Sequence, residues 1–256
     1  MISVWKMRFC VLGIFSLTIL FPALLISQQH DVQKIIQYID ELYRSKSSFA
    51  EMEMQIVTPH WERTLEMNIW TEGKDKTFIR ITAPNKERGT ATLRLDNETW
   101  NFLPKTNKVI KIPPSMMMSS WMGSDFKNDD VVNEFSLLDD YSYQFVQPEN
   151  PEPGFLYVEC IPREDLPIVW SKILMKVREA DYIPVKEEYF DEKNNLMRVM
   201  NYKEISDFDG RKIPKIMELI PQDEPGKKTV LKYIEAKFDF QVDKNIFTLR
   251  NLRSSI

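Results

Sequence analysis

Apolar and polar side chains alternate in the stretch that decides the fold, Ala50-Glu51-Met52-Glu53-Met54-Gln55-Ile56. A period of two is typical of a strand that buries one of its faces. The same alternation follows the turn at residues 58–60, where Trp61, Leu65, Met67 and Ile69 are separated by polar residues. We therefore predict two neighbouring half-buried strands.

Short segments of the same kind recur along the chain and are separated by turn residues. They lie at 77–82, 89–95, 99–103, 108–112, 155–161, 171–177, 184–190, 196–202, 215–221 and 229–238. Turn signals every 8–12 residues are typical of an antiparallel meander. We predict a mainly β domain, α+β in class, with about eleven strands and no tandem repeat.

A helical period occurs over residues 31–44. Asp31 is a favourable N-cap, and the residues after it place apolar side chains on one face: Val32, Ile35, Ile36, Ile39, Leu42 and Tyr43. This amphipathic helix needs an apolar surface to cover, and the sheet supplies one.

The N-terminus has the pattern of an export signal. Lys6 and Arg8 precede an uncharged apolar run over residues 9–26, as in a secretory signal. We predict a signal peptide at 1–27, cleaved near Ser27, and one domain at 28–256. The run is also long enough for an uncleaved membrane anchor. The net charge of −4 disfavours nucleic-acid binding.

The sequence offers no catalytic or metal-binding constellation. Gly123-Ser124-Asp125 lacks the second glycine of a nucleophile elbow. Cys160 lies in an apolar strand and is expected in the core, while His30 and His60 are expected in solvent. The acidic residues between Asp125 and Glu134 are expected to form a solvated surface. We predict a protein that is not an enzyme and needs no metal or cofactor.

A lid-like insertion at about 113–145 interrupts the strands. It begins with two prolines and carries a Met-rich run, Met116-Met117-Met118, followed by Trp121 and Met122. Methionine side chains adapt to variable apolar shapes, so the run suits either a core plug or a mobile flap. One helix and this insertion cannot cover the inner surface of a curled sheet of this size. An apolar pocket is the expected result.

Several segments resemble the LolA-like outer-membrane lipoprotein-sorting proteins, in the larger branch often associated with RND-type exporters. They are residues 84–93, 99–104, Met122-Gly123-Ser124-Asp125-Phe126, Asp129-Asp130, 189–191, 228–229 and 246–252. The resemblance covers nearly the whole chain after the signal. It implies an unclosed antiparallel β-barrel with a helical lid, an apolar cavity for acyl chains and a periplasmic location.

From the strand pattern and this resemblance together we predict the site. The expected cavity wall is Met52, Met54, Met67, Ile69, Leu93, Leu95 and Trp100. The expected lid or mouth is Ile35, Ile39, Met116, Met117, Met118, Trp121 and Met122. Arg80 is the expected equivalent of the arginine that holds the lid closed in the family's carrier.

The predicted function is a monomeric carrier that binds a lipid, lipoprotein acyl chains or another hydrophobic cargo and passes it toward the outer membrane. The resemblance also suggests an RND-type inner-membrane exporter as partner. The alternative is a non-transporting sensor or adaptor that docks on such a membrane protein through the acidic segment 125–134.

Overall fold

The computed structural model divides the chain into two units, residues 1–30 and 31–256, and it describes residues 30–43, 45–132, 136–164 and 166–254. The predicted signal peptide, 1–27, lies outside the described residues. Within the described ranges, none of the helices has the length and hydrophobicity needed to traverse a bilayer.

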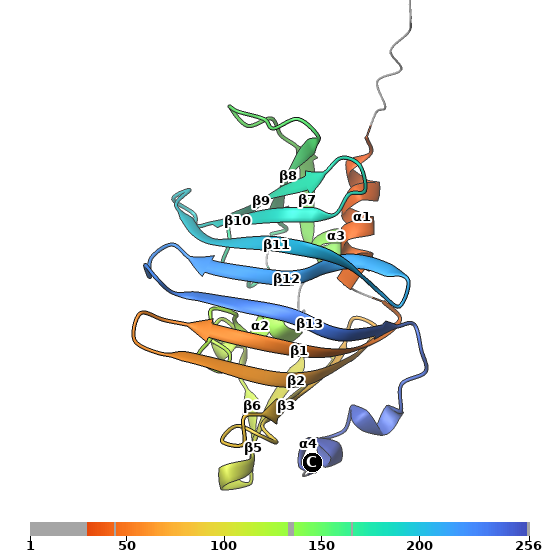
Figure 1. Ribbon diagram of the computed structural model, residues 1–256, viewed down its shortest axis with the longest axis vertical. Coiled ribbons are helices and arrows are strands. Elements are labelled where there is room, and N and C mark those ends of the chain that lie inside the picture. The colour runs from red at the N-terminus through yellow and green to blue at the C-terminus, as the bar shows by residue number, and fades with distance from the viewer. Residues whose placement is uncertain (1–29, 44, 133–135, 165, 255–256) are drawn as a thin grey trace, which may run out of the picture. The chain divides into compact units, whose positions relative to one another are not determined.

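Thirteen strands form one antiparallel sheet in the order β6-β5-β4-β3-β2-β1-β13-β12-β11-β10-β9-β8-β7 (Figure 1). Their bounds are β1 (Ser47–Val57), β2 (Glu62–Glu72), β3 (Lys76–Ala83), β4 (Ala91–Leu95), β5 (Glu98–Leu103), β6 (Lys108–Ile112), β7 (Tyr141–Phe145), β8 (Phe155–Pro162), β9 (Lys172–Arg178), β10 (Pro184–Phe190), β11 (Leu196–Phe208), β12 (Arg211–Pro221) and β13 (Lys228–Phe238).

Two meanders meet at the centre of this sheet. Strands β1–β6 and β7–β13 each follow chain order, and β1 pairs with β13 through contacts such as Met54 opposite Leu231. Strands β6 and β7 are the two edges, so the sheet is not closed. The predicted mainly β, unclosed antiparallel architecture is confirmed, with thirteen strands in place of about eleven.

The helices are few and short: α1 (Val32–Tyr43), α2 (Asn128–Val132), α3 (Leu137–Asp140) and α4 (Leu249–Leu252). The Asp31 side chain caps α1 as predicted, accepting a hydrogen bond from the backbone N–H of Gln33 at 3.0 Å. Arg211 donates from Nη1 to the carbonyl of Glu41 at 2.7 Å, at the opposite end of α1. Both helix ends thus have partners for their free backbone groups.

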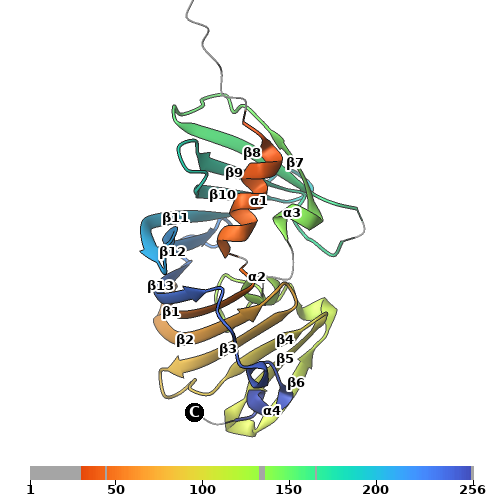
Figure 2. The ribbon, with the colours of Figure 1, turned by 90° about the vertical axis from the view of Figure 1, so that its right-hand side faces the viewer.

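Helix α1 and the segment 113–132 cover different halves of one face of the sheet, which we call the inner face. Ile35, Ile36 and Ile39 of α1 are buried against the inner face, and Figure 2 shows α1 beside β8–β10. The segment 113–132 contains α2 and lies over the half built from β1 to β5, since Trp121 donates from Nε1 to Thr92 Oγ1 at 3.1 Å.

The C-terminal residues cover part of the opposite, outer face. Phe78, Leu93 and Phe102 form a separate buried cluster with Val242, Phe247 and Leu252. Phe78 and Ile79 are sequence neighbours on β3, and Ile79 belongs to the inner-face cluster, so the two clusters lie on opposite faces.

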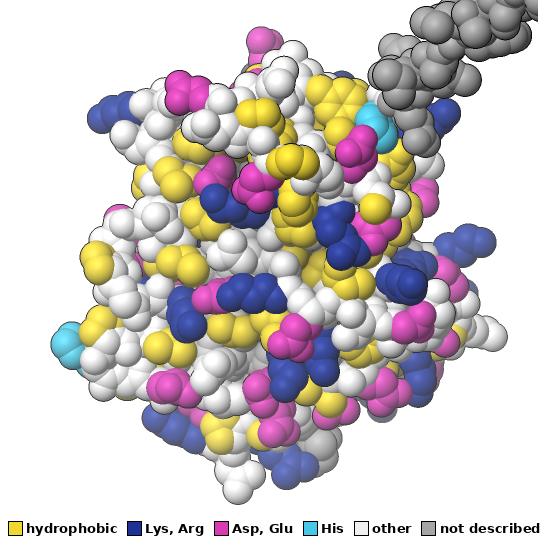
Figure 3. All heavy atoms as spheres, turned by 45° about the horizontal axis from the view of Figure 1, so that its top comes forward, with side chains coloured by type: hydrophobic (Ala, Val, Ile, Leu, Met, Phe, Trp, Pro, Cys, Tyr) yellow, Lys and Arg dark blue, Asp and Glu magenta, His cyan; other side chains and the backbone are white. Residues whose placement is uncertain are grey.

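On the surface seen in Figure 3, charged and hydrophobic side chains are interspersed.

Candidate functional site

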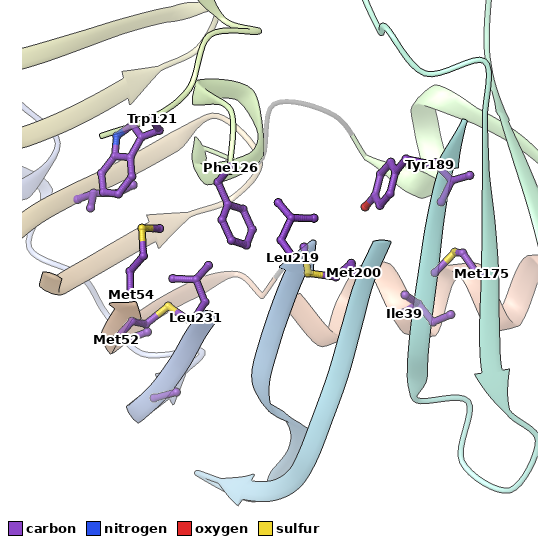
Figure 4. Packing of buried hydrophobic residues seen from close by; sticks show 14 of the residues in the cluster. Ile39, Met52, Met54, Trp121, Phe126, Met175, Tyr189, Met200, Leu219 and Leu231 are labelled. Carbon is purple, nitrogen blue, oxygen red and sulfur yellow. The ribbon is translucent and has the colours of Figure 1, made fainter. Parts of the chain in front are cut away.

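A cavity of about 290 Å³ lies on the inner face, between the two covers. Its apolar lining comes from α1, β1, β2, β9, β11–β13, residues 126–131, residue 137 and residues 168–170: Ile39, Phe49, Ala50, Met52, Ile69, Phe126, Val131, Leu137, Ile168, Trp170, Ile173, Met200, Met217, Leu231 and Phe238. Figure 4 shows labelled members of the surrounding core, with Phe126 and Leu231 on one side and Ile39 and Tyr189 on the other.

One end of the cavity is polar. Arg198 of β11 donates from Nη1 and Nη2 to the two carboxylate oxygens of Asp130, at 2.7 and 2.8 Å. The Arg198 side chain is only 6% exposed. Its guanidinium lies 4.4 Å from the ring centre of Trp170 and 4.2 Å from that of Tyr189. This charge is therefore buried, paired in a bidentate geometry and packed against two aromatic rings.

A buried acid, Glu187, faces the same space. Glu187 lies on β10, and the Tyr189 hydroxyl donates to its Oε2 at 2.5 Å. Burial raises the pKa of Glu187, against the opposing hydrogen bonds of Tyr189 and Tyr202 and the charge of Arg198. Burial also raises the pKa of Tyr189 well above its usual value. The environment thus favours the uncharged forms of both groups.

Replacement of Glu187 by glutamine tests this environment. A raised folded-state pKa means that the folded protein holds the proton more tightly, so this acid's contribution to stability falls as the pH rises above its ordinary value of 4.5. We expect the free energy of unfolding of Glu187→Gln, relative to the wild type, to increase from acidic to neutral pH. Urea denaturation of both proteins across this range measures the difference. A constant difference would contradict the assignment.

Buried polar contacts attach the segment 113–132 to the sheet. Asp125 is buried, accepts a hydrogen bond from Thr229 Oγ1 of β13 at 2.7 Å, and pairs with Lys227 at 3.2 Å. Ser124 donates to the carbonyl of Trp121 at 2.7 Å, which closes the turn at Gly123. The Gly-Ser-Asp-Phe motif thus fixes this cover and directs Phe126 to the cavity.

The predicted wall residues fall into three groups. Met52 and Ile69 line the cavity. Met54 and Met67 are fully buried in the same inner-face core without lining it. In contrast to the prediction, Leu93, Leu95 and Trp100 belong to the outer-face cluster under the C-terminal segment.

The prediction for Leu93 was wrong because both faces of β4 are buried. Leu93 pairs with Phe78 on one side and with Trp100 on the other, which extends the outer cluster across three strands. The inner face of β4 carries Thr92, which contacts Trp121, and Arg94, which donates to the carbonyl of Val132. Polar residues therefore face inward here because they bind the cover.

Of the predicted lid residues, the structure places only Ile39 on the cavity. Ile35 on α1 and Trp121 in the segment 113–132 are both buried in the inner-face core. In the Met-rich run Met117 is buried, Met118 is partly buried and Met116 is 48% exposed, while Met122 packs at the edge of the core. From this side the cavity is lined by Phe126 and Val131 instead.

Arg80, the predicted lid-holding residue, contacts the other end of the chain. It donates from Nη1 to the carbonyl of Ser254 at 2.7 Å and from Nη2 to the carbonyl of Asn251 at 2.5 Å. Strand parity places it beside Phe78 on the outer face, and burial lowers its pKa. Arg80 therefore holds the C-terminal helix α4. Within the described residues, its hydrogen-bond partners belong to neither cover of the cavity.

The acidic segment does not form the solvated surface expected from the sequence. Asp125 and Asp129 are 8% and 7% exposed, and Asp130 is paired with Arg198. Glu134 lies outside the described residues. Asp125 and Asp130 are tolerated there because Lys227 pairs with Asp125 and Arg198 pairs with Asp130. They therefore do not supply the docking surface on which the adaptor hypothesis depended.

Cys160 lies where the sequence predicts it. Its side chain is fully buried on β8 beside Met175, and burial raises the pKa of the thiol. A neutral, inaccessible thiol is a poor nucleophile. The described residues contain no group of His, Cys, Asp and Glu suited to a metal ion.

Sequence reasoning missed the residues that define the polar end: Asp130, Trp170, Glu187, Tyr189, Arg198 and Tyr202. Strand parity was the available signal. Glu187 and Tyr189 alternate on β10 with Lys186 and Glu188, and Arg198 shares a face with Met200 on β11. Both faces of β10 carry charged residues. The strand partners decide which face points inward, and the sequence of one strand does not show them.

A family model described as an uncharacterized protein matches residues 73–254, which spans most of the described sheet. The chain belongs to this family. A search of the curated proteins gives no match.

Solved structures share the fold of this family member over nearly their whole length. A DUF1329 family protein from Desulfovibrio piger is 23% identical, with a TM-score of 0.77 over 86% of this chain and 97% of its own. A domain described as an outer membrane lipoprotein-sorting protein, from Vibrio parahaemolyticus, is 22% identical, with a TM-score of 0.75 over 87% and 98%. A LolA superfamily protein from Nitrosomonas europaea is 21% identical, with a TM-score of 0.73 over 87% and 100%. The LolA-like fold predicted from the sequence is confirmed.

Proposed function

We propose that this protein is a periplasmic carrier that holds an apolar chain of a lipid or another hydrophobic molecule in the inner-face cavity. The observation that carries the proposal is the cavity itself, a mostly apolar space of about 290 Å³ between two covers of a curled sheet. The shared fold with LolA-like and lipoprotein-sorting proteins supports it.

The size and lining of the cavity suit one hydrocarbon chain. An apolar cavity of about 150 Å³ accommodates a benzene-sized molecule, and this cavity has roughly twice that volume. Each buried methylene contributes about 0.8 kcal/mol, so eight of them contribute about 6 kcal/mol before the cost of association. Since the cost of association is subtracted from this sum, the net binding free energy is modest. Binding is therefore reversible, as a carrier requires.

Location and partner follow from the same proposal. A carrier for acyl chains acts where they must cross water between two membranes, so we place it in the periplasm after cleavage near Ser27. Mass measurement of the exported protein tests the cleavage. The RND-type exporter stays a prediction, which co-purification from membranes tests, and light scattering tests the predicted monomer.

The proposal is tested by filling the cavity. Ile69 lines it and is only partly buried, so a larger side chain can project into the space. We expect Ile69→Trp to weaken uptake of a fluorescent fatty acid at least about tenfold, since displaced methylenes each forfeit about 0.8 kcal/mol. Fluorescence titration of delipidated protein measures this, and mass spectrometry of natively extracted protein identifies bound lipid.

Ile110→Trp is the matched control. Ile110 is 43% exposed on the edge strand β6 and does not line the cavity, so this variant should bind like the wild type. Delipidated wild-type protein that takes up no fatty acid would overturn the proposal. Equal loss in both variants would place the binding site elsewhere.

A further inference from the structure

We propose that a second cavity, on the outer face of the sheet, binds a small aromatic carboxylate. This outer-face pocket has a volume of about 260 Å³ and shares no lining residue with the inner-face cavity. The inference is therefore independent of the proposed function. It follows from three features of the lining: a positive charge without a counter-charge, a set of free polar groups and an adjacent aromatic pair.

The outer-face pocket lies between strands β2 and β3 and the C-terminal segment, which runs from β13 to α4 (Figure 2). Asn68 pairs directly with Arg80, and Trp70 pairs with Phe78 in the same way. These residues occupy alternate strand positions, so their side chains share the face opposite to Ile79. The complete lining is Asn68, Trp70, Phe78, Arg80, Thr82, Ile246 and Asn251.

Among the described residues that line this pocket, Arg80 is the only charged one. It is 8% exposed, and its hydrogen-bond partners are two backbone carbonyls and the hydroxyl of Ser254, all uncharged. Burial lowers the pKa of Arg80, and no acid in the described part of the chain raises it. A guanidinium nevertheless stays charged, and a buried charge without an opposite charge is unfavourable. A bound anion supplies that opposite charge.

The acids on the same face do not compensate Arg80. Glu51 is the β1 partner of Asn68, and Glu66 lies two residues before Asn68 on β2. Neither of them lines the pocket. Glu51 is partly exposed and Glu66 is exposed, so water and salt screen their charges. The charge preference of the pocket is therefore set by Arg80.

Three polar side chains in the lining are available to a ligand. Within the described residues, the side chains of Asn68, Trp70 and Thr82 make no hydrogen bond, and all three residues are partly exposed. The indole N–H can only donate a hydrogen bond, whereas the amide and the hydroxyl can donate or accept. An ionised carboxylate only accepts. The free groups of this pocket therefore suit a carboxylate.

The aromatic pair suits a flat apolar body attached to that carboxylate. The ring centres of Trp70 and Phe78 are 5.8 Å apart, and the Arg80 guanidinium lies 4.9 Å from the ring centre of Phe78. Aromatic surface and positive charge are thus adjacent. An apolar cavity of about 150 Å³ accommodates a benzene-sized molecule, so this larger pocket has room for a bicyclic ring.

Equilibrium dialysis with 2-naphthoate tests the proposal, and 2-naphthamide is the uncharged probe of the same shape. At neutral pH we expect the protein to bind 2-naphthoate at least about fivefold more tightly than 2-naphthamide, because charges interact strongly where water is partly excluded. An excess of 1-dodecanol, which is uncharged and suits the inner-face cavity, should not displace 2-naphthoate.

Asn68→Asp tests the origin of the preference. It introduces a carboxylate directly opposite Arg80 with little change of shape, and so supplies the missing counter-charge. We expect binding of 2-naphthoate to weaken at least about fivefold and that of 2-naphthamide to change less than about twofold. Asn68→Gln is the matched control, because it keeps an uncharged amide. The ratio of the two affinities should stay as in the wild type.

Each outcome supports or overturns the proposal. Equal binding of the two probes by the wild type would overturn it, and so would the same loss of preference in Asn68→Asp and Asn68→Gln. Displacement of 2-naphthoate by 1-dodecanol would place the aromatic acid in the inner-face cavity instead. If Asn68→Asp does not fold, Arg80→Met should lose the preference and Arg80→Lys should keep it. Failure of fatty-acid uptake, with these results intact, would overturn only the proposed function.

Discussion

Replacement of Asp130 by alanine should lower the free energy of unfolding by about 3–5 kcal/mol, since it leaves a buried guanidinium without its counter-charge. The Arg198 side chain is 6% exposed, and Asp130 binds both of its Nη atoms. The pair joins α2 in the cavity cover to β11 in the sheet, so its loss should also loosen the cover. Urea denaturation followed by tryptophan fluorescence measures the change.

Two further variants distinguish burial of the charge from loss of any ion pair. Asp139 pairs with Lys74, and both side chains are about half exposed, at 50% and 54%. Asp139→Ala should therefore cost less than about 1 kcal/mol. The double variant Asp130→Leu with Arg198→Met should recover most of the stability, because it removes both charges. An Asp130→Ala variant no less stable than Asp139→Ala would contradict the prediction.

Replacement of Phe126 by alanine should lower the free energy of unfolding by about 3–5 kcal/mol and enlarge the cavity. Phe126 is 5% exposed, and its side chain is part of the cavity lining. A larger cavity should shift the preferred fatty-acid chain toward greater length. Denaturation measures the stability, and competition with fatty acids of increasing length measures the preference.

Leu93→Ala is the matched control for Phe126→Ala. Leu93 is fully buried, so the variant should cost about 2–5 kcal/mol. Leu93 lies in the outer-face cluster, however, and its removal leaves the cavity unchanged. We expect no change in preferred chain length. The same shift in both variants would mean that the preference reflects lost stability and not the shape of the site.

Period-two alternation predicted most of the sheet correctly. Where one face is polar, as in β1 and β2, alternation identifies both the strand and its buried side, and Met52 and Ile69 do line the cavity. The edge strand β7 was missed although Tyr141–Phe145 alternates aromatic and polar residues, because it is only five residues long, follows directly on α3 and was assigned to the lid-like insertion. Its existence depends on pairing with β8.

The composition of a strand buried on both faces does not show which face points inward. Leu93, Leu95 and Trp100 share a face as predicted, but the C-terminal segment that covers it lies about 150 residues further along the chain. The polar end of the cavity was not predicted for the same reason. Arg198 and Asp130 come from separate elements, and their opposite charges are brought together only by the fold.

The pairing of β1 with β13 has a consequence for how the protein forms. Met52 lies opposite Tyr233 at the centre of the sheet, so the ladder that unites the two meanders joins the first strand to the last. Contacts of such long sequence separation slow folding, because a large loop must close before they form. Until synthesis of β13 is finished, β1 presents an unpaired edge, the kind of surface that chaperones shield from aggregation.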